Sequence, residues 1–414
     1  MSRLRLALLA LVAAAVLLAV GVLATREGGD DRAAAPVTTT ASRAPAPRAS
    51  PRLAAVGKPI GITEFNAGLL GTGPVPAAAA PFRAALVALR PRYLRVVVNW
   101  AGLQPDPAQP ARLDGPSDGC VRGIGPCVPD TGVRAQLQAA RARGWEVVVV
   151  ITGVPTWAAK APSGCERTDA EPRMRPITPQ GLVAYGALLD QVDRLGRGLG
   201  LAMGWWSPWN EPNHPAFVSP QRAACATSSP SLSPAVYTAF VRVAQRVLGP
   251  RGASFVLGEE AGFRRPSPRS TGVGEFVRAL PDDVACAASA WSQHEYASPD
   301  DEAQAPFSRD AVADAEAALA RRPCTRDVPL WVTETGVGGA KSGADRTTTD
   351  AALATQCERM AARLQRWRTD PRVAAVFAYT FREDPVYPVG LADAALTRLY
   401  PTYWLWRTGR CPAS

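Results

Sequence analysis

Two glutamates stand directly after predicted β-strands, in segments that could carry chemistry. Glu211 occurs in WSPWNEPN, residues 206–213, and Glu334 occurs in LWVTETG, residues 330–336. Two carboxyl groups across a cleft can cleave a glycosidic bond, because one protonates the departing oxygen and the other stabilises or attacks the anomeric carbon. A single strand-end carboxylate can equally cap a helix or pair with arginine. The occurrence of two such glutamates favours the catalytic interpretation.

The elements that must position these residues follow from the pattern of residues 57–414. Short β-branched runs alternate with longer amphipathic stretches, which is typical of strand–helix units around a parallel sheet. We count eight units, and eight favour a single closed (β/α)8 TIM barrel over an open sheet. The predicted strands are residues 60–65, 93–99, 146–152, 203–209, 254–258, 290–294, 330–333 and 374–381.

Three of the intervening helices are predicted to begin at hydroxyl caps. These are Thr178, Ser233 and Ser308, of which the first two precede a proline. In such a barrel the carboxyl ends of the strands form the active site. Glu211 and Glu334 follow strands four and seven, nearly opposite each other across the barrel mouth.

The same segments resemble those of the clan A glycoside hydrolases, barrels whose two glutamates follow strands four and seven. The Asn-Glu-Pro motif at Glu211 is most similar to the family 39 and family 5 branches, and the resemblance extends over about residues 57–407. It implies that Glu211 is the acid/base, that Glu334 is the nucleophile, and that Asn210 binds the sugar 2-hydroxyl.

The resemblance also implies a reaction, the retaining double displacement on a β-linked glycan. Glu334 attacks the anomeric carbon while Glu211 protonates the departing oxygen, and Glu211 then activates water. This mechanism requires carboxyl groups about 5 to 5.5 Å apart and a raised pKa on Glu211. The sugar and the linkage are left open by the motif.

Three further positions match the pattern of the clan. Arg95 on strand two would hold Glu334 ionised. His294 and Tyr296 are two residues apart and share one face of strand six; the resemblance implies that His294 lines the site and that Tyr296 donates to the nucleophile. A strand-edge ion pair for Arg95 and a core imidazole for His294 are the alternatives. Glu295 faces the other way and receives no role.

Aromatic residues near the predicted rim are candidates for stacking on sugar rings. Trp100 and Trp157 follow strands two and three, and Phe381 stands where the clan usually has a tryptophan platform. Packing within the barrel is the alternative for each ring. Glu259 and Glu260 end strand five and could contact substrate, but a solvated pair is the favoured prediction.

Composition excludes a disordered chain and a small disulfide scaffold. The chain has 414 residues, 47% of them hydrophobic, and a formal net charge of +10. Its basic residues are scattered arginines and only three lysines, so no nucleic-acid partner is predicted. No metal or cofactor is predicted, because His214 and His294 cannot form a three-histidine zinc site. The glycine-rich segment 336–342 lacks the glycine before lysine that a phosphate loop needs.

The first 56 residues are predicted to serve targeting. Residues 1–24 form a signal peptide or signal anchor, because Arg3 and Arg5 precede an apolar run. Residues 25–56 are rich in Ala, Pro and Thr and are predicted to be a disordered linker. Residues 57–414 are then a catalytic domain outside the cytoplasm, secreted or membrane-anchored, and a monomer.

Eight cysteines suit an oxidising compartment. Their positions in the predicted loops favour sequential pairing over the other arrangements, with reduced thiols as the alternative. The predicted disulfides are Cys120–Cys127, Cys165–Cys225, Cys286–Cys324 and Cys357–Cys411.

Two other classes of protein stay open. A catalytically silent barrel could bind glycan at the cell surface. A basic protein could act through charge alone, and its binding would then collapse as salt is added.

Overall fold

The structure is a computed structural model, and it describes residues 56–115, 132–163, 165, 171–297, 308, 310–338, 346–384 and 387–413. The chain divides into Met1–Ser50 and Pro51–Ser414, and all described residues belong to the second unit. The predicted signal segment and nearly all of the predicted linker lie outside the described residues. Within those residues no helix is both long and apolar enough to cross a bilayer.

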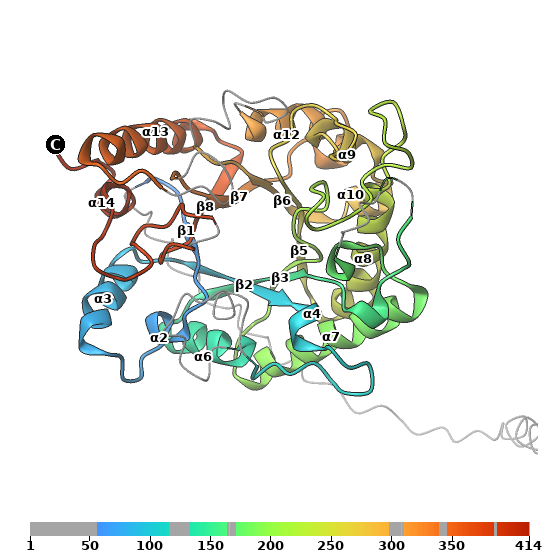
Figure 1. Ribbon diagram of the computed structural model, residues 1–414, viewed down its shortest axis with the longest axis horizontal. Helices are drawn as coiled ribbons and strands as arrows, with labels where there is room; N and C mark the ends of the chain where they lie inside the picture. Colours follow the sequence, from blue (N-terminus) through green and yellow to red (C-terminus); the bar gives the residue numbers. More distant parts are fainter. Residues whose placement is uncertain are drawn as a thin grey trace, which may run out of the picture. The chain divides into compact units, whose positions relative to one another are not determined.

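Eight parallel strands close into a barrel in sequence order, with helices around them (Figure 1). The pairing of β1 with β8 completes the closure. The predicted (β/α)8 barrel is therefore confirmed. The strands are β1 (Ile60–Thr63), β2 (Tyr93–Asn99), β3 (Glu146–Thr152), β4 (Trp205–Ser207), β5 (Ser254–Glu260), β6 (Ala288–His294), β7 (Leu330–Thr335) and β8 (Val373–Tyr379).

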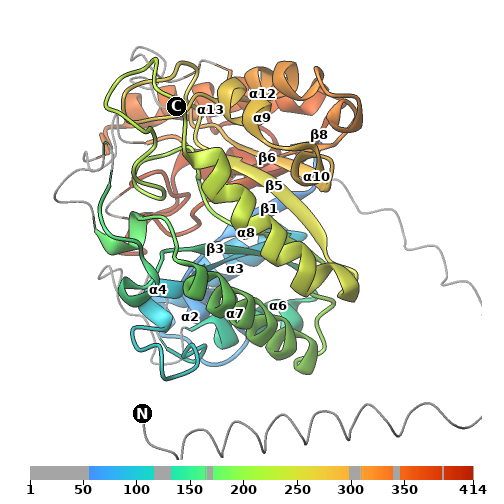
Figure 2. The ribbon, with the colours of Figure 1, turned by 90° about the vertical axis from the view of Figure 1, so that its right-hand side faces the viewer.

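The helices lie outside the strands, and α7 packs beside α8 on the flank seen in Figure 2. The α-helices are α2 (Ala67–Leu70), α3 (Ala80–Ala88), α4 (Trp100–Leu103), α6 (Val133–Arg143), α7 (Pro179–Gly198), α8 (Ser233–Leu248), α9 (Val273–Ala279), α10 (Asp282–Ala285), α12 (Ala311–Leu319), α13 (Asp350–Thr369) and α14 (Pro401–Thr408). Short 3-10 turns cover Ala77–Ala79, Thr156–Ala158, Pro172–Met174, Gly249–Arg251 and Pro323–Thr325.

One of the three predicted helix caps is confirmed. The Thr178 hydroxyl accepts a hydrogen bond from the Gly181 amide at 3.0 Å and caps α7. Ser233 is instead the first residue of α8 and makes no cap. Asp310, not Ser308, caps α12 by accepting from Ala313 at 3.1 Å, because a carboxylate two residues later takes the same role.

The amino-terminal half of the barrel interior is filled by aromatic rings. Trp331 contacts Tyr93 and Trp205 with ring centroids 4.9 and 4.7 Å apart, and Tyr93 stacks on Phe377 at 5.6 Å. This cluster, which we call the aromatic plug, joins residues of β2, β4, β7 and β8. It leaves only the opposite, carboxyl-terminal end of the barrel for polar side chains.

Three of the four predicted disulfides are confirmed. Cys165–Cys225 joins the loops after β3 and β4, Cys286–Cys324 joins the segments before β6 and β7, and Cys357–Cys411 ties α13 to the residues after α14. The predicted Cys120–Cys127 bond lies outside the described residues. Three disulfides indicate an oxidising, extracytoplasmic compartment.

Glycine at position 61 of β1 is required by the aromatic plug, because a Cβ there would lie 2.0 Å from a Phe377 ring carbon. We expect Gly61→Ala to lower the free energy of unfolding by about 1–3 kcal/mol, the usual cost of overpacking. Urea denaturation measures the change. Gly73→Ala is the matched control, since nothing lies within 4 Å of its added Cβ. Equal stability of the two variants would show that the plug is loosely packed.

Candidate active site

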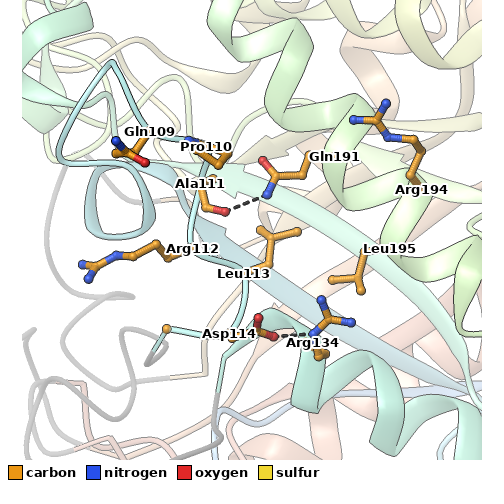
Figure 3. A pocket seen from close by; sticks show the side chains of 11 residues that line it. Gln109, Pro110, Ala111, Arg112, Leu113, Asp114, Arg134, Gln191, Arg194 and Leu195 are labelled. Atoms are coloured by element: carbon orange, nitrogen blue, oxygen red, sulfur yellow. Dashed lines mark hydrogen bonds and ion pairs between the residues drawn. The ribbon is translucent and has the colours of Figure 1, made fainter.

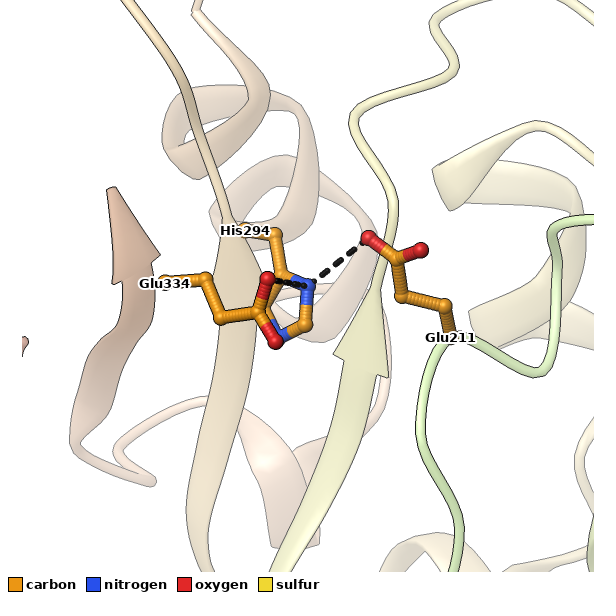
Figure 4. Close-up of side chains that lie close together, drawn as sticks. All are labelled: Glu211, His294 and Glu334. Carbon is orange, nitrogen blue, oxygen red and sulfur yellow. Dashed lines mark hydrogen bonds and ion pairs between the residues drawn. The ribbon is translucent and has the colours of Figure 1, made fainter. Parts of the chain in front are cut away.

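The two predicted catalytic glutamates meet at the carboxyl-terminal end of the barrel. Glu211, after β4, and Glu334, in β7, point toward one another with the His294 ring of β6 beside them (Figure 4). One oxygen of each carboxylate and one His294 ring nitrogen all lie within 4.8 Å of one another. The side chains of Glu211 and Glu334 keep 14% and 10% of their surface exposed, so both can be reached by a ligand.

A β-bulge turns Glu334 into the barrel. By strict alternation Glu334 would share the outward face of Val332, since Trp331 belongs to the interior plug. The pairing of β6 with β7 shifts register between Ser292 and His294, so that His294 stands opposite Glu334. The additional residue re-aims the carboxylate into the site, as bulges beside active sites do.

Glu334 is held by both of its predicted partners. Arg95 Nη1 forms an ion pair with Oε1 at 2.7 Å, and the Tyr296 hydroxyl donates to Oε2 at 2.6 Å. His294 Nδ1 lies 3.6 Å from Oε2. Each carboxylate oxygen therefore has its own partner, a cation at Oε1 and a hydroxyl donor at Oε2, which fixes the orientation of the group.

Arg95 is fully buried and links three residues of the site. Besides Glu334, its Nη2 donates to Asn210 Oδ1 at 2.7 Å and to Glu259 Oε2 at 2.6 Å. The neighbouring carboxylates raise the pKa of Arg95 although burial lowers it. Arg95 is thus a permanent cation at the centre of the site, and not a strand-edge residue.

His294 bridges two carboxylates. Its Nδ1 lies 2.9 Å from Glu211 Oε1, and its Nε2 lies 2.9 Å from Glu259 Oε2. Burial opposes the charged ring, but the negative charges of Glu334, Glu211 and Glu259 raise the pKa of His294 to about 10. Since an imidazole donates from both nitrogens only as imidazolium, two carboxylate partners favour the protonated ring, with one N–H directed at Glu211.

This contact reverses the predicted pKa shift of Glu211. Burial raises the pKa of Glu211, but the hydrogen bond and charge of His294 outweigh it and hold the pKa below its ordinary value. The predicted raised pKa is therefore wrong for the unliganded protein. The hydrogen bond with His294 thus favours the ionised form of the Glu211 carboxyl group.

Glu259 and Glu260 are not the solvated pair that the sequence predicts, because both are fully buried. The β5–β6 pairing shifts register between Gly258 and Glu260, which turns Glu259 inward to Arg95 and His294. Burial raises the pKa of Glu259, but Arg95 and His294 lower it to about 2. Glu260 accepts from Trp291 Nε1 at 3.2 Å, and burial raises its pKa well above the ordinary value.

Glu259 is the site residue that the sequence analysis missed. The available signal was Gly258, because a glycine inside a strand marks a bulge. Its φ of 94° and a Cβ position 2.5 Å from Ser292 O require glycine there.

The predicted aromatic platform differs from the observed rings. Trp100 and Phe381 are fully buried, and Trp100 donates from Nε1 to Gln104. Trp157 is partly exposed and packs edge-on against Trp100 at 5.7 Å. Beside the candidate nucleophile, the rings are those of Tyr379 and Tyr387, which contact Tyr296 at centroid distances of 6.4 and 4.8 Å; both are partly exposed.

The cluster of Glu211, His294 and Glu334 has the composition of a metal site but not its chemistry. Both His294 nitrogens lie 2.9 Å from carboxylate oxygens, and a ring protonated on both nitrogens has no lone pair for a cation. Arg95 already supplies a second positive charge to the same carboxylates. The donor set therefore fits a proton better than a metal ion.

Two pockets lie near or beside the barrel. One, of about 360 Å³, is formed by the loops after β3, β4 and β5. Its lining includes Arg269 and His214, and His214 is three residues after Glu211 in the sequence. The other, of about 800 Å³, lies beside α6 and α7, where Gln191 donates to Ala111 O and Arg134 pairs with Asp114 (Figure 3). None of the predicted catalytic residues lines the second pocket.

Comparison with known proteins identifies the fold. No protein-family model matches the sequence, and a search of curated proteins finds no match. Among solved structures, the chain is similar to a family 39 glycoside hydrolase from Bacteroides cellulosilyticus WH2, with a TM-score of 0.52 and 15% identity over 86% of this chain and 64% of that one. The chain thus spans less than two-thirds of that protein.

A second similar structure is a GH5_18 protein from Bifidobacterium longum subsp. infantis. The TM-score is 0.50, with 16% identity over 84% of this chain and 77% of that one. These two likenesses agree with the closed eight-stranded barrel and confirm the predicted fold of this chain.

Arg95 offers a test of the site's electrostatics. We expect Arg95→Met to lower the free energy of unfolding at pH 7 by about 3–5 kcal/mol, because Glu259 and Glu334 lose a buried partner. Chemical denaturation measures it. The control is Arg92→Met, directly before β2, whose pair with Glu146 is more than one-third exposed; it should cost less than about 1 kcal/mol.

The same comparison has a pH signature. Because the folded-state pKa of Glu259 is depressed, its contribution is complete above the ordinary value of 4.5 and is lost as pH falls toward 2. The stability gap between the parent and Arg95→Met should therefore narrow over that window. A gap that stays constant would contradict the ion pair.

Proposed function

We propose that the chain is a glycoside hydrolase that cleaves a β-linked glycan with retention of anomeric configuration. The observation that carries the proposal is the approach of Glu211 and Glu334, whose oxygens lie within 4.8 Å of each other at the barrel mouth. Retaining enzymes need carboxyl groups about 5 to 5.5 Å apart, whereas inverting enzymes need about 6.5 to 9.5 Å to admit a water.

In the first step Glu334 acts as the nucleophile. Its carboxylate attacks the anomeric carbon, and the bond from that carbon to the departing oxygen breaks. Arg95 and Tyr296 hold the two oxygens in place, so the attacking group loses little freedom. Glu211 delivers a proton to the departing oxygen, drawn from the hydrogen bond that it shares with His294.

In the second step the roles of the groups reverse. Glu211 accepts a proton from water, the hydroxide adds to the anomeric carbon, and the bond to Glu334 breaks. The Glu211–His294 pair ends with the proton it held at the start. Because the configuration at the anomeric carbon is inverted in each step, the product has the configuration of the substrate.

Other predicted residues fit around the sugar. The side-chain oxygen Oδ1 of Asn210 accepts a hydrogen bond from Arg95. The side-chain NH2 group of Asn210 therefore supplies donors for a sugar hydroxyl. Trp157, Tyr379 and Tyr387 are partly exposed rings suited to stacking. Trp100 and Phe381 are buried and support these residues by packing.

The place of action is also part of the proposal. The three disulfides favour work outside the cytoplasm on an extracellular glycan. We further propose that residues 1–24, if they are not cleaved, hold the protein at the membrane.

The test is hydrolysis of a panel of β-linked glycans and aryl β-glycosides. Glu334→Gln should lower kcat at least about 10³-fold because the attacking carboxylate is lost. Glu211→Gln should lower kcat about 10²- to 10⁴-fold on natural linkages and less on aryl glycosides with good leaving groups. Proton NMR of the first-formed sugar should show the β-anomer.

Glu146→Gln, at the amino-terminal end of β3, is the matched control and should keep full activity. Equal activity of Glu334→Gln and the parent would reject Glu334 as nucleophile. An α-anomer as first product would reject retention. Glycan binding without turnover by the parent would favour the silent barrel.

A further inference from the structure

We propose that Glu259 is a positioning residue that, through His294, holds the acid proton of the site directed at Glu211. The inference rests on the proposed function for its catalytic meaning. It concerns a third carboxylate, separate from the Glu211–Glu334 pair.

A continuous chain of contacts carries the proposal. Arg95 Nη2 donates to Glu259 Oε2 at 2.6 Å, His294 Nε2 lies 2.9 Å from that same oxygen, and His294 Nδ1 lies 2.9 Å from Glu211 Oε1. The chain thus runs from a fixed cation to the proposed acid. All of its members except Glu211 are fully buried.

Glu259 also determines which ring nitrogen releases its proton. When imidazolium gives up the Nδ1 proton to Glu211, the remaining N–H is on Nε2 and still donates to Glu259. The neutral ring then has its acceptor nitrogen facing Glu211, ready for the proton that water later returns. One proton leaves Nδ1 and one comes back, so the cycle balances.

The backbone is strained where these contacts are made. Glu211 and Glu259, the two carboxylates in hydrogen-bond contact with His294, have φ values of 40° and 52°. Non-glycine residues in this left-handed region cost about 1 kcal/mol or more and persist where the surroundings enforce them. The surrounding structure therefore enforces the backbone conformation at both residues that contact the imidazole.

The charges facing His294 come from four strands. Glu211 follows β4, Glu334 lies in β7, and the Arg95 guanidinium lies in β2. Glu259 and Glu260 end β5, and burial raises the pKa of Glu260 well above its ordinary value. His214 adjoins Glu211, and Tyr296 adjoins Glu334. Removing the negative charge of Glu259 therefore removes one support of the imidazolium, while Glu211 and Glu334 remain.

Glu259→Gln changes charge with little change of shape. Oε2 accepts both hydrogen bonds, and Oε1 has no hydrogen-bond partner among the described residues. An amide can place its oxygen at Oε2 and keep both bonds. We expect the pKa of His294 to fall by about 1 to 3 units, the effect of one opposite charge at this distance.

The chain offers a direct readout, because it has only two histidines. NMR of the full chain carrying isotope-labelled histidine reports both rings, and His214→Gln assigns them. In the parent, His294 should stay protonated from about pH 5 to about pH 9, well past its ordinary pKa of about 6.5. In Glu259→Gln its signals should titrate at lower pH than in the parent.

Kinetics supply the second readout. The alkaline limb of the kcat/KM profile should move to lower pH by the same shift in Glu259→Gln, because that limb reports loss of the acid proton. Glu260→Gln is the matched control: it is the adjacent buried residue, its carboxyl group contacts Trp291 and not His294, and burial raises its pKa well above the ordinary value, so the substitution should leave both the titration and the profile unchanged.

The outcomes separate the inference from the proposed function. A parent His294 that titrates near its ordinary pKa, or a Glu259→Gln variant whose His294 titrates as in the parent, overturns the inference. A parent without glycosidase activity overturns the proposed function. The NMR titration then still decides whether the charge of Glu259 keeps His294 protonated. Should Glu259→Gln fail to fold, Glu259→Asp, which keeps the charge, should fold and keep His294 protonated; an ordinary titration there counts against the proposal.

Discussion

Charge balance in the barrel mouth is the constraint on which the rest of the site depends. The carboxylates of Glu211, Glu259 and Glu334 surround two cations, Arg95 and the His294 imidazolium. Each buried charge would be unstable alone, so each must be placed within hydrogen-bond distance of an opposite one. Three features of the backbone meet this condition. They are the positions of the strand ends, the bulges in the β5–β6 and β6–β7 pairings, and the strained backbone at Glu211 and Glu259.

The aromatic plug explains how the barrel can tolerate such a cluster. Tyr93, Trp205, Trp331 and Phe377 fill the amino-terminal interior with large rings. Because close-packed interiors deform little, the strands that carry Arg95 and Glu334 start from a rigid base. Polar function and apolar packing are thus separated along the barrel axis, with the plug fixing the strands and the charged cluster using their ends.

The sequence predicts the barrel and much of the site because both depend on patterns that it displays. β-Branched runs mark the strands, and residues two apart, such as His294 and Tyr296, fall on one face. Alternation fails at bulges, where an extra residue reverses the faces, and this is why Glu259 was placed in solvent. The pKa of Glu211 was misjudged for a related reason, since the contact with His294 depends on tertiary geometry. Aromatic composition does not distinguish a stacking platform from core packing, so the sequence leaves both interpretations open for Trp100 and Phe381, and the structure buries both.

The bulge in β5 has a further consequence for how the site can vary. Glu259 and Glu260 are adjacent, and they face opposite sides of the strand, one toward Arg95 and one toward Trp291. A regular pleat through Gly258 would exchange their faces and point Glu260 inward. Either register therefore presents a carboxylate to Arg95. The doublet therefore makes this part of the barrel tolerant of a one-residue slip of β5.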